Sequence, residues 1–463
     1  MPETVDAIVV GAGQAGPSLA VRLAEAGRKV VLIEKERLGG TCVNNGCIPT
    51  KTLVASARVA HVARTAAAFG VVTGPVQVDL AAVKARKDAV VQQSRDSLAT
   101  WIGNTANLEL ILGEGRFAGP DSIAVNGRTL QAPLIVLNTG GHPVRPDWPA
   151  LDPRLLLTNL EMMELDRLPR RLIVVGGSYI GLEFAQMYRR FGAEVVVLEG
   201  ADRIIAREDA DVSAAVQAML EREGIRFHTG CRDLVGADQG DGVVVRWQHA
   251  AGPQLVEGDL VLAAIGRRPN VAGLDLDKAG IAVDARGFIQ VDGRLRTSAP
   301  GVFALGDVHG RGAFTHTSYN DFEVLAANLL DGADQSIDQR LFGYALFTDP
   351  PLARVGMNDR DALASGRRIL RAELPMARIG RARERGETTG FLRVLVDAMT
   401  ERFVGATLFG IEADEIIHQF ILAMNEGLSF HAMMRAVPVH PTVSELIPTL
   451  LARLRPIEGP PGV

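Results

Sequence analysis

Two cysteines, Cys42 and Cys47, lie five positions apart and carry the clearest chemistry in the sequence. The chain has only one other cysteine, Cys231, so the pair indicates a redox centre and not a structural disulfide framework. On a straight helix, Cα atoms five positions apart are separated by roughly 8–9 Å, whereas a disulfide requires about 4.4–6.8 Å. We therefore expect Gly46 and Pro49 to distort the segment, and the resulting disulfide to be readily reduced.

A glycine-rich segment precedes the cysteine pair and must help to position it. The apolar run at 5–10 is followed by Gly11, Gly13 and Gly16, then by an amphipathic stretch and a second apolar run that ends at Glu34. Strand, glycine turn, helix, strand and acid, in this order, predict a dinucleotide-binding βαβ unit. The glycines allow a pyrophosphate to approach the helix N-terminus, and the acid accepts hydrogen bonds from a ribose diol.

The same pattern returns 165 residues later, where an apolar run at 172–175 leads to Gly176 and Gly181. In both copies the acid lies 23 residues after the first glycine, which makes Glu199 the second acid. Ser178 replaces the middle glycine, so we expect the pyrophosphate to shift slightly but the site to remain. Two unrelated glycine turns are the alternative interpretation.

Two dinucleotide units and a cysteine pair predict an electron relay from reduced nicotinamide through a flavin to a disulfide. The pair follows directly on the first unit, so we expect FAD in the first unit and the nicotinamide nucleotide in the second. Thr139 and Gly140 end a strand-like run that is suited to a chain crossing between domains. Gly306 and Asp307 end a later strand, where the carboxylate can accept from the ribityl chain of the flavin. Gly266 lies in an expected linker back to the first domain.

The segment from Gly39 to Lys51, which includes Gly40 and Thr41, resembles the active-site segment of the class I flavoprotein disulfide reductases. This family includes lipoamide dehydrogenase, glutathione reductase and mercuric reductase. The resemblance follows the family's order of motifs along nearly the whole chain. It implies an α/β fold with two Rossmann-like dinucleotide-binding domains and a C-terminal α+β dimerisation domain. The domains implied are FAD-binding, NAD(P)-binding, a return to the FAD or central region and a dimer-interface domain, at 1–148, 149–270, 271–340 and 341–463.

The resemblance also implies roles for residues around the pair. Cys47 is expected to lie against the flavin, and Cys42 to be the outer thiol that exchanges with substrate. Lys51, one helical turn beyond Cys47, is expected near the flavin and paired with Glu183 in a buried ion pair. Tyr179 matches a position that covers the nicotinamide side of the flavin and moves when the nucleotide binds. Simple packing at the start of a helix is the alternative for Tyr179.

A thiol-exchange enzyme needs a base that activates the outer thiol and protonates the leaving thiol. His440 stands five residues before Glu445, and the resemblance implies that this histidine is the base and the glutamate its orienting partner. In the family the dyad comes from the partner subunit, so a homodimer with a shared active site is expected. His316 follows the Gly-Asp turn, and a role near the flavin stays open. Cys231 is interpreted as a buried, inert thiol. The other histidines are interpreted as surface or packing residues: His61, His142, His228, His249, His309, His418 and His431.

The composition of the chain argues against nucleic acid and anionic membranes as partners. The net charge is −5, with both signs mixed along the chain, which gives no basic footprint for nucleic acid or an anionic membrane. No run of 18 apolar residues and no secretory signal are evident, so a cytoplasmic protein that acts on a small molecule is expected. No metal site is predicted.

The nucleotide and the substrate are less sharply defined by the sequence. A carboxylate at Glu199 favours NADH, although Arg203 and Arg207 could partly offset its repulsion of the NADPH phosphate. No cysteine follows Cys231, so substrate must reach the outer thiol directly. Lipoamide dehydrogenases usually have a second histidine two places before the catalytic one, where this chain has Pro438.

Together with the segment at 350–356, this proline makes the chain resemble the mercuric-reductase-like branch, which includes reactive-chlorine resistance flavoproteins. Three hypotheses follow: a reductase of a small disulfide, oxidised thiol or soft metal ion; a dihydrolipoamide dehydrogenase; or a flavin-binding sensor or scaffold. The region after 341 reads as a separate unit with strands at 390–396 and 402–409 and a helix at 413–425. The residues at 455–463 are expected to be frayed.

Overall fold

The first of two parallel sheets contains four strands from the N-terminal part of the chain and a fifth strand from residues 302–304. The computed structural model describes residues 2–457. Every residue of β2 (Ala7–Val10) and β3 (Val30–Glu34) is buried, which explains their unbroken apolar sequence, because helices or sheets cover both faces of a parallel sheet. The strand order is β19-β8-β2-β3-β4, completed by β4 (Leu108–Leu112), β8 (Ile135–Leu137) and β19 (Val302–Ala304).

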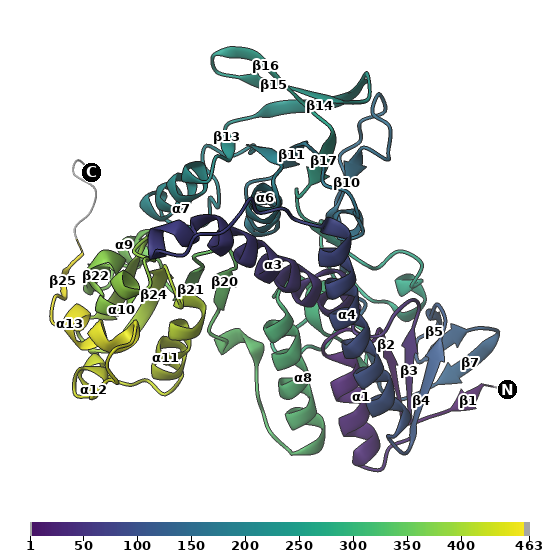
Figure 1. Cartoon of the computed structure of the whole chain (residues 1–463). Helices are drawn as coiled ribbons and strands as arrows, with labels where there is room; N and C mark the ends of the chain where they lie inside the picture. The colour runs from purple at the N-terminus through teal and green to yellow at the C-terminus, as the bar shows by residue number, and fades with distance from the viewer. Residues whose placement is uncertain (1, 458–463) are drawn as a thin grey trace.

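Helices cover one face of this sheet and an antiparallel meander covers the other. α1 (Gly16–Glu25) connects β2 to β3 and packs beside α8 (Thr315–Leu330) (Figure 1). The meander contains β5 (Arg116–Gly119), β6 (Ser122–Val125) and β7 (Arg128–Gln131), and β1 (Glu3–Thr4) pairs with β7 in parallel. The two apolar layers fix the carboxyl ends of the strands, where parallel sheets bind their ligands.

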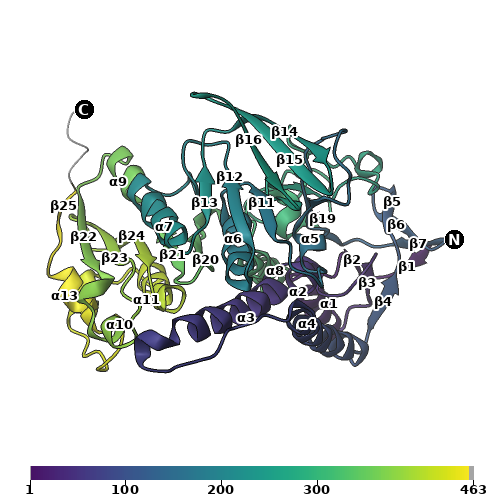
Figure 2. The same ribbon diagram turned by 45° about the horizontal axis from the view of Figure 1, so that its top comes forward.

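Two long helices cross the molecule between its regions. α3 (Cys47–Thr65) continues into η1 (Ala66–Phe69), and α4 (Leu80–Gly103) returns alongside it. Figures 1 and 2 both show α3 running from the first sheet towards the C-terminal domain.

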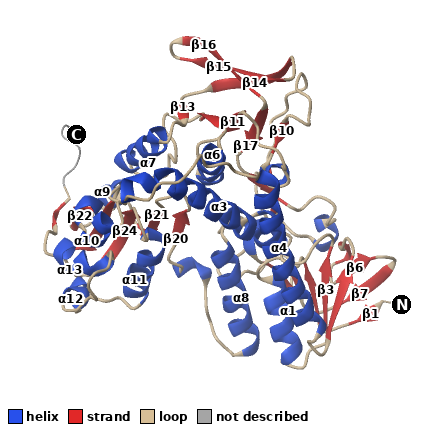
Figure 3. Ribbon diagram, in the orientation of Figure 1, coloured by secondary structure: helices blue, strands red, loops and turns tan. Residues whose placement is uncertain are grey.

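The second parallel sheet has the order β10-β17-β11-β12-β13. α6 (Tyr179–Phe191) connects β11 (Arg171–Val175) to β12 (Glu194–Leu198), which repeats the arrangement of the first unit. A three-stranded antiparallel sheet lies beyond it, at the top of the view in Figure 3. The remaining elements of this region are β10 (Leu156–Leu157), α5 (Asn159–Met162), α7 (Ala210–Arg222), β13 (Arg226–His228), β14 (Arg232–Gln239), β15 (Gly242–His249), β16 (Gly252–Gly258) and β17 (Leu260–Ala263).

A short antiparallel pair connects the two dinucleotide regions. β9 (Gly141–Pro143) follows the first sheet, β18 (Arg267–Pro269) follows the second, and the two strands pair in register. The chain then returns through η2 (Leu276–Ala279) to β19, which pairs with β8 in the first sheet. The glycines at 140 and 266 therefore lie where the chain crosses between the regions.

The C-terminal domain is a six-stranded antiparallel sheet in the order β20-β21-β24-β23-β22-β25. The predicted strands and helix are confirmed as β23 (Phe391–Asp397), β24 (Phe403–Phe409) and α11 (Ala413–Asn425), and the helix packs on β21 and β24. The other elements of this domain are β20 (Gly343–Leu346), β21 (Leu352–Gly356), α9 (Asp359–Ala364), β22 (Ile369–Pro375), η5 (Met376–Arg378), α10 (Gly380–Glu384), α12 (Phe430–Met434), η6 (Ser444–Leu446), α13 (Ile447–Leu451) and β25 (Arg455–Pro456).

The expected α/β class is confirmed by the two parallel sheets and the separate C-terminal unit. The expectation that the tail frays from position 455 is wrong at its start, because β25 pairs with β22. Residues 458–463 lie outside the described part of the chain. Between residues 2 and 457, no helix is both long enough and apolar enough to cross a membrane.

Candidate active site

Cys42 and Cys47 lie on two different helices that meet at Gly46. α2 (Gly40–Asn45) ends before this glycine, and α3 begins after it. A Cβ on Gly46 would lie 2.8 Å from the carbonyl oxygen of Thr41, so only glycine allows this close approach. The expected distortion at Gly46 is present, but Pro49 lies inside the first turn of α3 and does not break it. Both thiols are free, with Cys42 half-buried and Cys47 exposed.

The surroundings of Cys47 favour its thiolate. The Cys42 thiol, the Thr315 hydroxyl and the charge of Lys51 lower the pKa of Cys47 to about 6, against the opposing effect of burial. The Thr315 Oγ1 lies 3.1 Å from Cys47 Sγ. The same hydrogen bond to Cys47, together with burial, raises the pKa of Cys42. One thiol is therefore poised as an anion and its neighbour as a proton donor.

Thr315 was missed in the sequence, although its neighbour His316 was considered. Thr315 is the first residue of α8, so Cys47 lies against the starts of two helices, α3 and α8, where free N–H groups favour an anion. His316 instead contacts the Gly343 carbonyl at 2.8 Å and stacks on Phe314, and burial lowers the pKa of its imidazole. The histidine is directed at β20 and not at the thiols.

The predicted pair of Lys51 and Glu183 is present between α3 and α6, with Nζ and Oε2 separated by 2.9 Å. It is less buried than expected, because the Glu183 side chain is 7% exposed but that of Lys51 is 35% exposed. The Phe347 N–H donates to the second carboxylate oxygen at 3.0 Å, and the Lys51 ammonium lies 4.5 Å from the Phe347 ring centroid. Phe347 was not anticipated from the sequence.

In the first glycine loop, the backbone lies so close to neighbouring carbonyl groups that a side chain would not fit. Gly11 has φ +104°, and a Cβ there would collide with the Asn138 carbonyl oxygen. A Cβ on Gly16 would collide with the Gly11 carbonyl oxygen. The Glu34 carboxylate accepts from the N–H of Ala12 at 2.8 Å, which fixes the acid beside the loop.

Asn138 braces this loop and was missed in the sequence. Its Oδ1 accepts from the Gly16 N–H at 3.0 Å, and its Nδ2 donates to the Leu305 carbonyl at 3.0 Å. The brace therefore ties α1 to the turn before Gly306. A Cβ on Gly40 would lie 2.8 Å from the Cα of Gly13, so the two backbone segments pack together at a distance that glycine permits.

The remaining residues assigned to FAD surround the same loop. Arg267, also missed in the sequence, donates to Thr41 Oγ1 at 3.2 Å and lies 3.8 Å from the Asp307 carboxylate. Burial raises the pKa of Asp307 and lowers that of Arg267. Thr139 Oγ1 donates to the Asn270 carbonyl at 2.8 Å.

Space for a ligand remains beside these groups. Gly140 and Gly266 have positive φ, and a Cβ on either would meet no atom within 4 Å. The glycine loop at the start of α1, the acid Glu34 and the half-buried Asp307 together fit FAD.

His309 was expected to be a surface or packing residue, but it forms a buried polar pair beneath this site. Its Nε2 lies 2.8 Å from the Asp321 carboxylate, which also accepts from the Gly306 N–H at 2.7 Å and contacts Arg340. The pair therefore supports the Gly306–Asp307 turn from below.

The second glycine loop repeats the geometry of the first. Gly176 has φ +113°, and a Cβ there would collide with the carbonyl oxygen of Ala264, which directly follows β17. A Cβ on Gly181 would collide with the Gly176 carbonyl. The Glu199 carboxylate accepts from the N–H groups of Gly177 at 2.6 Å and of Ala201 at 2.7 Å. This arrangement fits a second dinucleotide.

Tyr179 directly follows the second glycine loop and is the first residue of α6. Its hydroxyl donates to Glu208 at 3.2 Å, and its ring meets Tyr344 edge-on at 5.5 Å. Arg203 donates to the Ala206 and Glu208 carbonyls and is thus bound to its own loop.

The His440–Glu445 contact is present, with Nδ1 and Oε2 separated by 2.7 Å. The Thr442 N–H also donates to this carboxylate, at 3.2 Å. The histidine side chain is 79% exposed whereas that of the glutamate is 11% exposed. The carboxylate therefore fixes one ring nitrogen and leaves the other free.

The dyad and the cysteine pair lie at opposite ends of α3. Glu445 neighbours Gly380 in α10, and Gly386 just after α10 neighbours Phe69 at the end of η1. Cys47 begins α3, whose 19 residues span about 28 Å. The dyad cannot therefore reach the thiols of its own chain in this conformation.

Two further expectations concern Cys231 and metals. Cys231 is buried, and burial raises its pKa to about 11, as suits an unreactive thiol. Within residues 2–457 no group of three or more His, Cys, Asp or Glu side chains is placed to hold a metal ion.

Comparison with known proteins matches both parts of the chain to one family. Residues 5–321 match the family described as pyridine nucleotide-disulphide oxidoreductase, and residues 343–451 match its dimerisation domain. A dihydrolipoyl dehydrogenase of Thermus scotoductus is 35% identical over 96% of each chain. A mercuric reductase of Bacillus cereus is 30% identical over 95% of this chain and 70% of its own length.

A probable pyridine nucleotide-disulfide oxidoreductase, RclA of Escherichia coli, is 34% identical over 97% of this chain and 99% of its own. Its solved structure, a Cu(II) complex of an HOCl-induced flavoprotein disulfide reductase, has a TM-score of 0.88 over 96% of this chain and 99% of its own.

Proposed function

Since the chain belongs to the pyridine nucleotide-disulphide oxidoreductase family and is a flavoprotein oxidoreductase, we propose that it reduces a small oxidant with electrons from a nicotinamide nucleotide, by way of Cys42 and Cys47. One observation carries the proposal: Cys42 and Cys47 lie on either side of Gly46 where α2 meets α3, and Cys47 Sγ lies 3.1 Å from Thr315 Oγ1 at the start of α8. No cysteine follows Cys231, so substrate meets the pair directly.

The residues of the chain suit each step of disulfide exchange. FAD, when bound in the first unit, supplies the two-electron carrier between nicotinamide and the cysteine pair. Two electrons and two protons convert the Cys42–Cys47 disulfide into the dithiol. Once its proton has passed to a base, Cys42 attacks a substrate disulfide and forms a mixed disulfide, and the leaving thiolate takes up a proton to become the first released thiol. The Cys47 thiolate then attacks Cys42 Sγ, re-forms the pair and releases the second thiol.

Proton transfer from Cys42, and then to the leaving thiolate, needs an acid–base group near Cys42. We assign it to His440 of the partner subunit, because the dyad of the same chain lies at the far end of α3. The match of residues 343–451 to the dimerisation domain supports a homodimer. Its carboxylate partner, Glu445, keeps one ring nitrogen occupied and the other available for transfer.

We propose that the substrate is a small disulfide, an oxidised thiol or a soft metal ion. Pro438 in place of a second histidine favours this class over dihydrolipoamide. A relative with a TM-score of 0.88 was solved as a Cu(II) complex, which suits a thiol pair as reductant. Two Cu(II) ions would each take one electron and leave two Cu(I), the disulfide and two protons.

Dihydrolipoamide oxidation is the second candidate. It is favoured by a dihydrolipoyl dehydrogenase that is 35% identical over 96% of each chain. The third hypothesis, a flavin-binding sensor or scaffold, loses support because the relatives are named as enzymes.

We propose NADH as the preferred donor. The Glu199 carboxylate is fixed by two loop amides where a ribose diol would lie, and Arg203 is bound to its own loop. A fixed carboxylate repels the 2′-phosphate of NADPH.

A substrate panel tests the proposal. The FAD-loaded protein is assayed with NADH or NADPH against low-molecular-weight disulfides, Cu(II) and Hg(II), and with dihydrolipoamide and NAD⁺ in the reverse direction. NADH-dependent turnover that Cys42→Ser abolishes is expected. Turnover of dihydrolipoamide at ~10–10³ s⁻¹ would instead favour the second candidate.

A further inference from the structure

The residues on either side of Thr315 are both held by β20, the first strand of the C-terminal domain. Phe314 precedes Thr315 as the N-cap residue of α8, and its ring stacks on that of Tyr344, with centroids 5.7 Å apart and planes 8° apart. His316 follows Thr315, and its Nε2 donates to the Gly343 carbonyl at 2.8 Å. A stacked pair of rings and a hydrogen bond therefore fix the chain before and after Thr315.

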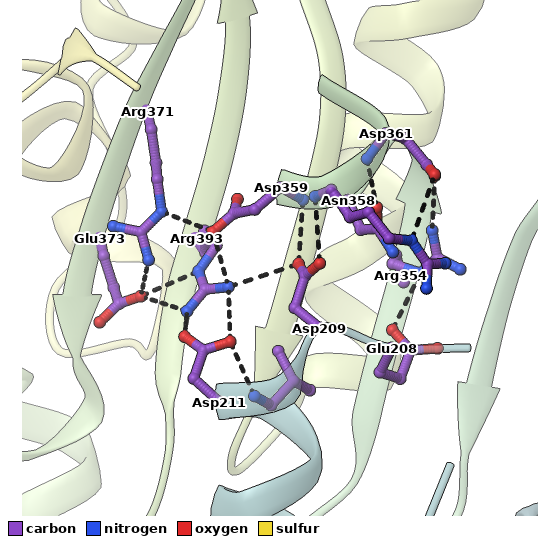
Figure 4. Close-up of polar contacts among 12 residues, drawn as sticks. Glu208, Asp209, Asp211, Arg354, Asn358, Asp359, Asp361, Arg371, Glu373 and Arg393 are labelled. Carbon is purple, nitrogen blue, oxygen red and sulfur yellow. Dashed lines mark hydrogen bonds and ion pairs between the residues drawn. The ribbon is translucent and has the colours of Figure 1, made fainter. Parts of the chain in front are cut away.

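Tyr344 is itself fixed by contacts outside β20. Its hydroxyl donates to the fully buried Glu208 carboxylate and accepts from Arg354 Nε at 2.7 Å. The Arg354 guanidinium also lies 5.1 Å from the centroid of the Tyr344 ring. Glu208 lies in the irregular segment between β12 and α7, and Figure 4 shows Arg354 of β21 directed at it. The Tyr344 ring is therefore a firm support for whatever packs on it.

The end of the same strand reaches a second group beside the thiol. Directly after β20, the Phe347 N–H donates to the Glu183 carboxylate at 3.0 Å, and Glu183 pairs with Lys51 at 2.9 Å. Thr315 and Lys51 are two of the groups that favour the Cys47 thiolate. Both of them are therefore bound, through one intermediate residue, to a strand of the C-terminal domain.

We propose that β20 positions Thr315 against Cys47 of the same chain, and that Tyr344 is the positioning residue of this strand. The Tyr344 ring holds Phe314, and Phe314 holds the start of α8 where Thr315 Oγ1 lies 3.1 Å from Cys47 Sγ. The C-terminal domain thus acts on the thiol of its own chain, in addition to the role of His440 in the partner subunit. The inference deepens the proposed function and rests on it, because it takes Cys47 to be a redox thiol.

Removal of the Tyr344 ring should weaken the Cys47 thiolate. In Tyr344→Leu, the pH at which half of Cys47 is ionised should rise by about one unit, as expected when a thiolate loses one hydrogen bond. Tyr344→Phe keeps the stacked ring and should keep the wild-type midpoint. Thr315→Val deletes the hydroxyl itself and sets the full effect. The double variant of Tyr344→Leu and Thr315→Val should rise no further than Thr315→Val alone, because both changes remove the same hydrogen bond.

The midpoint is measured on FAD-loaded protein in which every variant, and the reference protein, carries Cys42→Ser. Cys47 then cannot form its disulfide, so the thiol is studied without a reductant or a nicotinamide nucleotide. The rate of alkylation of Cys47 against pH, with the label located by peptide mass, gives the midpoint. Long-wavelength absorbance from a thiolate beside the flavin gives it independently. The other titratable or charged groups that act on Cys47 stay unchanged in all variants: Lys51 of α3, Glu183 of α6 and Arg267 of β18.

Two further variants guard against a general loss of packing. Tyr319→Leu is the matched control, because Tyr319 is another aromatic residue of α8 that pairs edge-on with Phe322 at 5.2 Å and lies outside the stack. Its midpoint should equal that of the reference protein. Phe314→Leu removes the other ring of the stack, leaves the partners of Glu208 intact and should raise the midpoint as Tyr344→Leu does. It decides the matter even if melting temperatures show that Tyr344→Leu is unfolded.

The outcomes separate this inference from the proposed function. A midpoint that rises in Thr315→Val but stays unchanged in Tyr344→Leu and Phe314→Leu would overturn the role of Tyr344 alone. Additive rises in the double variant would overturn it as well, and so would a full rise in Tyr344→Phe, which keeps the ring. The relay itself is tested apart from these midpoints: failure of NADH to generate new thiols in the enzyme with both cysteines would overturn the proposed function.

Discussion

The two dinucleotide units share one backbone design but differ in what surrounds it. In both, the first glycine has a positive φ and approaches the carbonyl of the residue that directly follows a neighbouring strand, Asn138 after β8 in the first unit and Ala264 after β17 in the second. In both, the acid accepts a hydrogen bond from the loop, at 2.8 Å and 2.6 Å respectively. The shared part is thus the part that any dinucleotide requires.

The difference lies at the residue whose carbonyl the glycine approaches. The Asn138 side chain bonds both α1 and the turn before Gly306, whereas the methyl group of Ala264 can brace nothing. The first unit is also enclosed by segments distant in sequence, such as Thr41 and Arg267. The second is bordered by Tyr179, whose hydroxyl donates to Glu208 and whose ring packs edge-on against Tyr344. The comparison indicates a first unit built to retain its ligand and a second built to exchange it.

The largest effect is expected from substitutions of the first glycine in each loop, made one unit at a time. Gly11→Ala forces a Cβ into the Asn138 carbonyl at positive φ, and we expect it to cost on the order of 2–4 kcal/mol and to abolish FAD retention. Gly176→Ala meets the same collision with Ala264 but should leave FAD bound and abolish nicotinamide binding. Flavin absorbance per mole of purified protein and calorimetry with NAD⁺ measure the two effects. Equal flavin loss in both variants would remove the distinction between the units.

The next largest effect is expected when the Asn138 side chain, which braces the first glycine loop, is removed. Asn138→Ala removes two hydrogen bonds and leaves the Leu305 carbonyl without its donor, so the free energy of unfolding should fall by about 1–3 kcal/mol and FAD should dissociate more readily. The matched change in the second unit is Ser178→Gly, which restores the glycine of the first loop and deletes a side chain that caps nothing. The Kd for NAD⁺ in that variant should stay within about threefold of wild type. Flavin retained on dialysis by Asn138→Ala would argue against the brace.

A smaller effect is expected on the preference for NADH over NADPH when the acid of either unit, Glu34 or Glu199, is changed. Glu199→Gln removes the charge that repels a 2′-phosphate, so the ratio of kcat/KM for NADH to that for NADPH should fall by about tenfold, in keeping with the energy of a single charged contact. Glu34→Gln in the first unit should weaken FAD binding and leave that ratio unchanged. A ratio that shifts with Glu34 instead would reverse the assignment of the two cofactors.

The smallest effect is expected on the pKa of the Cys47 thiol. Alkylation of the reduced enzyme at Cys47 should be half-maximal near pH 6 and should slow at lower pH as the thiolate takes up a proton. Thr315→Val deletes the donor at 3.1 Å that stabilises the thiolate, so the midpoint should rise. Thr315→Ser keeps the hydroxyl and should restore the midpoint. Identical profiles for wild type and Thr315→Val would show that Thr315 does not stabilise the thiolate.

Sequence alone could predict the features whose signals are local. The glycine loops with their acids and the break at Gly46 lie within short stretches of chain, where spacing determines geometry. The His440–Glu445 contact and the Lys51–Glu183 pair, whose residues are 132 apart, were predicted only through family resemblance.

The missed residues have no local signal. Asn138 meets Gly16 across 122 positions, and Thr315 meets Cys47 across 268, so only the fold brings them together. Glu208 lies in an irregular loop with no motif, and its burial results from packing against β20 and β21. The expected break at Pro49 was wrong because proline is compatible with the first turn of a helix, where no backbone N–H is needed.

The central claim is that Cys42 and Cys47 carry the electrons between the nicotinamide nucleotide and the substrate. Anaerobic titration of the oxidised, FAD-loaded enzyme with NADH, followed by a count of accessible thiols, tests it most directly. We predict two new thiols per subunit in the wild type, none in Cys47→Ser, and long-wavelength absorbance from a thiolate beside the flavin in the wild type but not in Cys47→Ser. An NADH-reduced enzyme that gains no thiols while it still reduces its substrate would contradict the account.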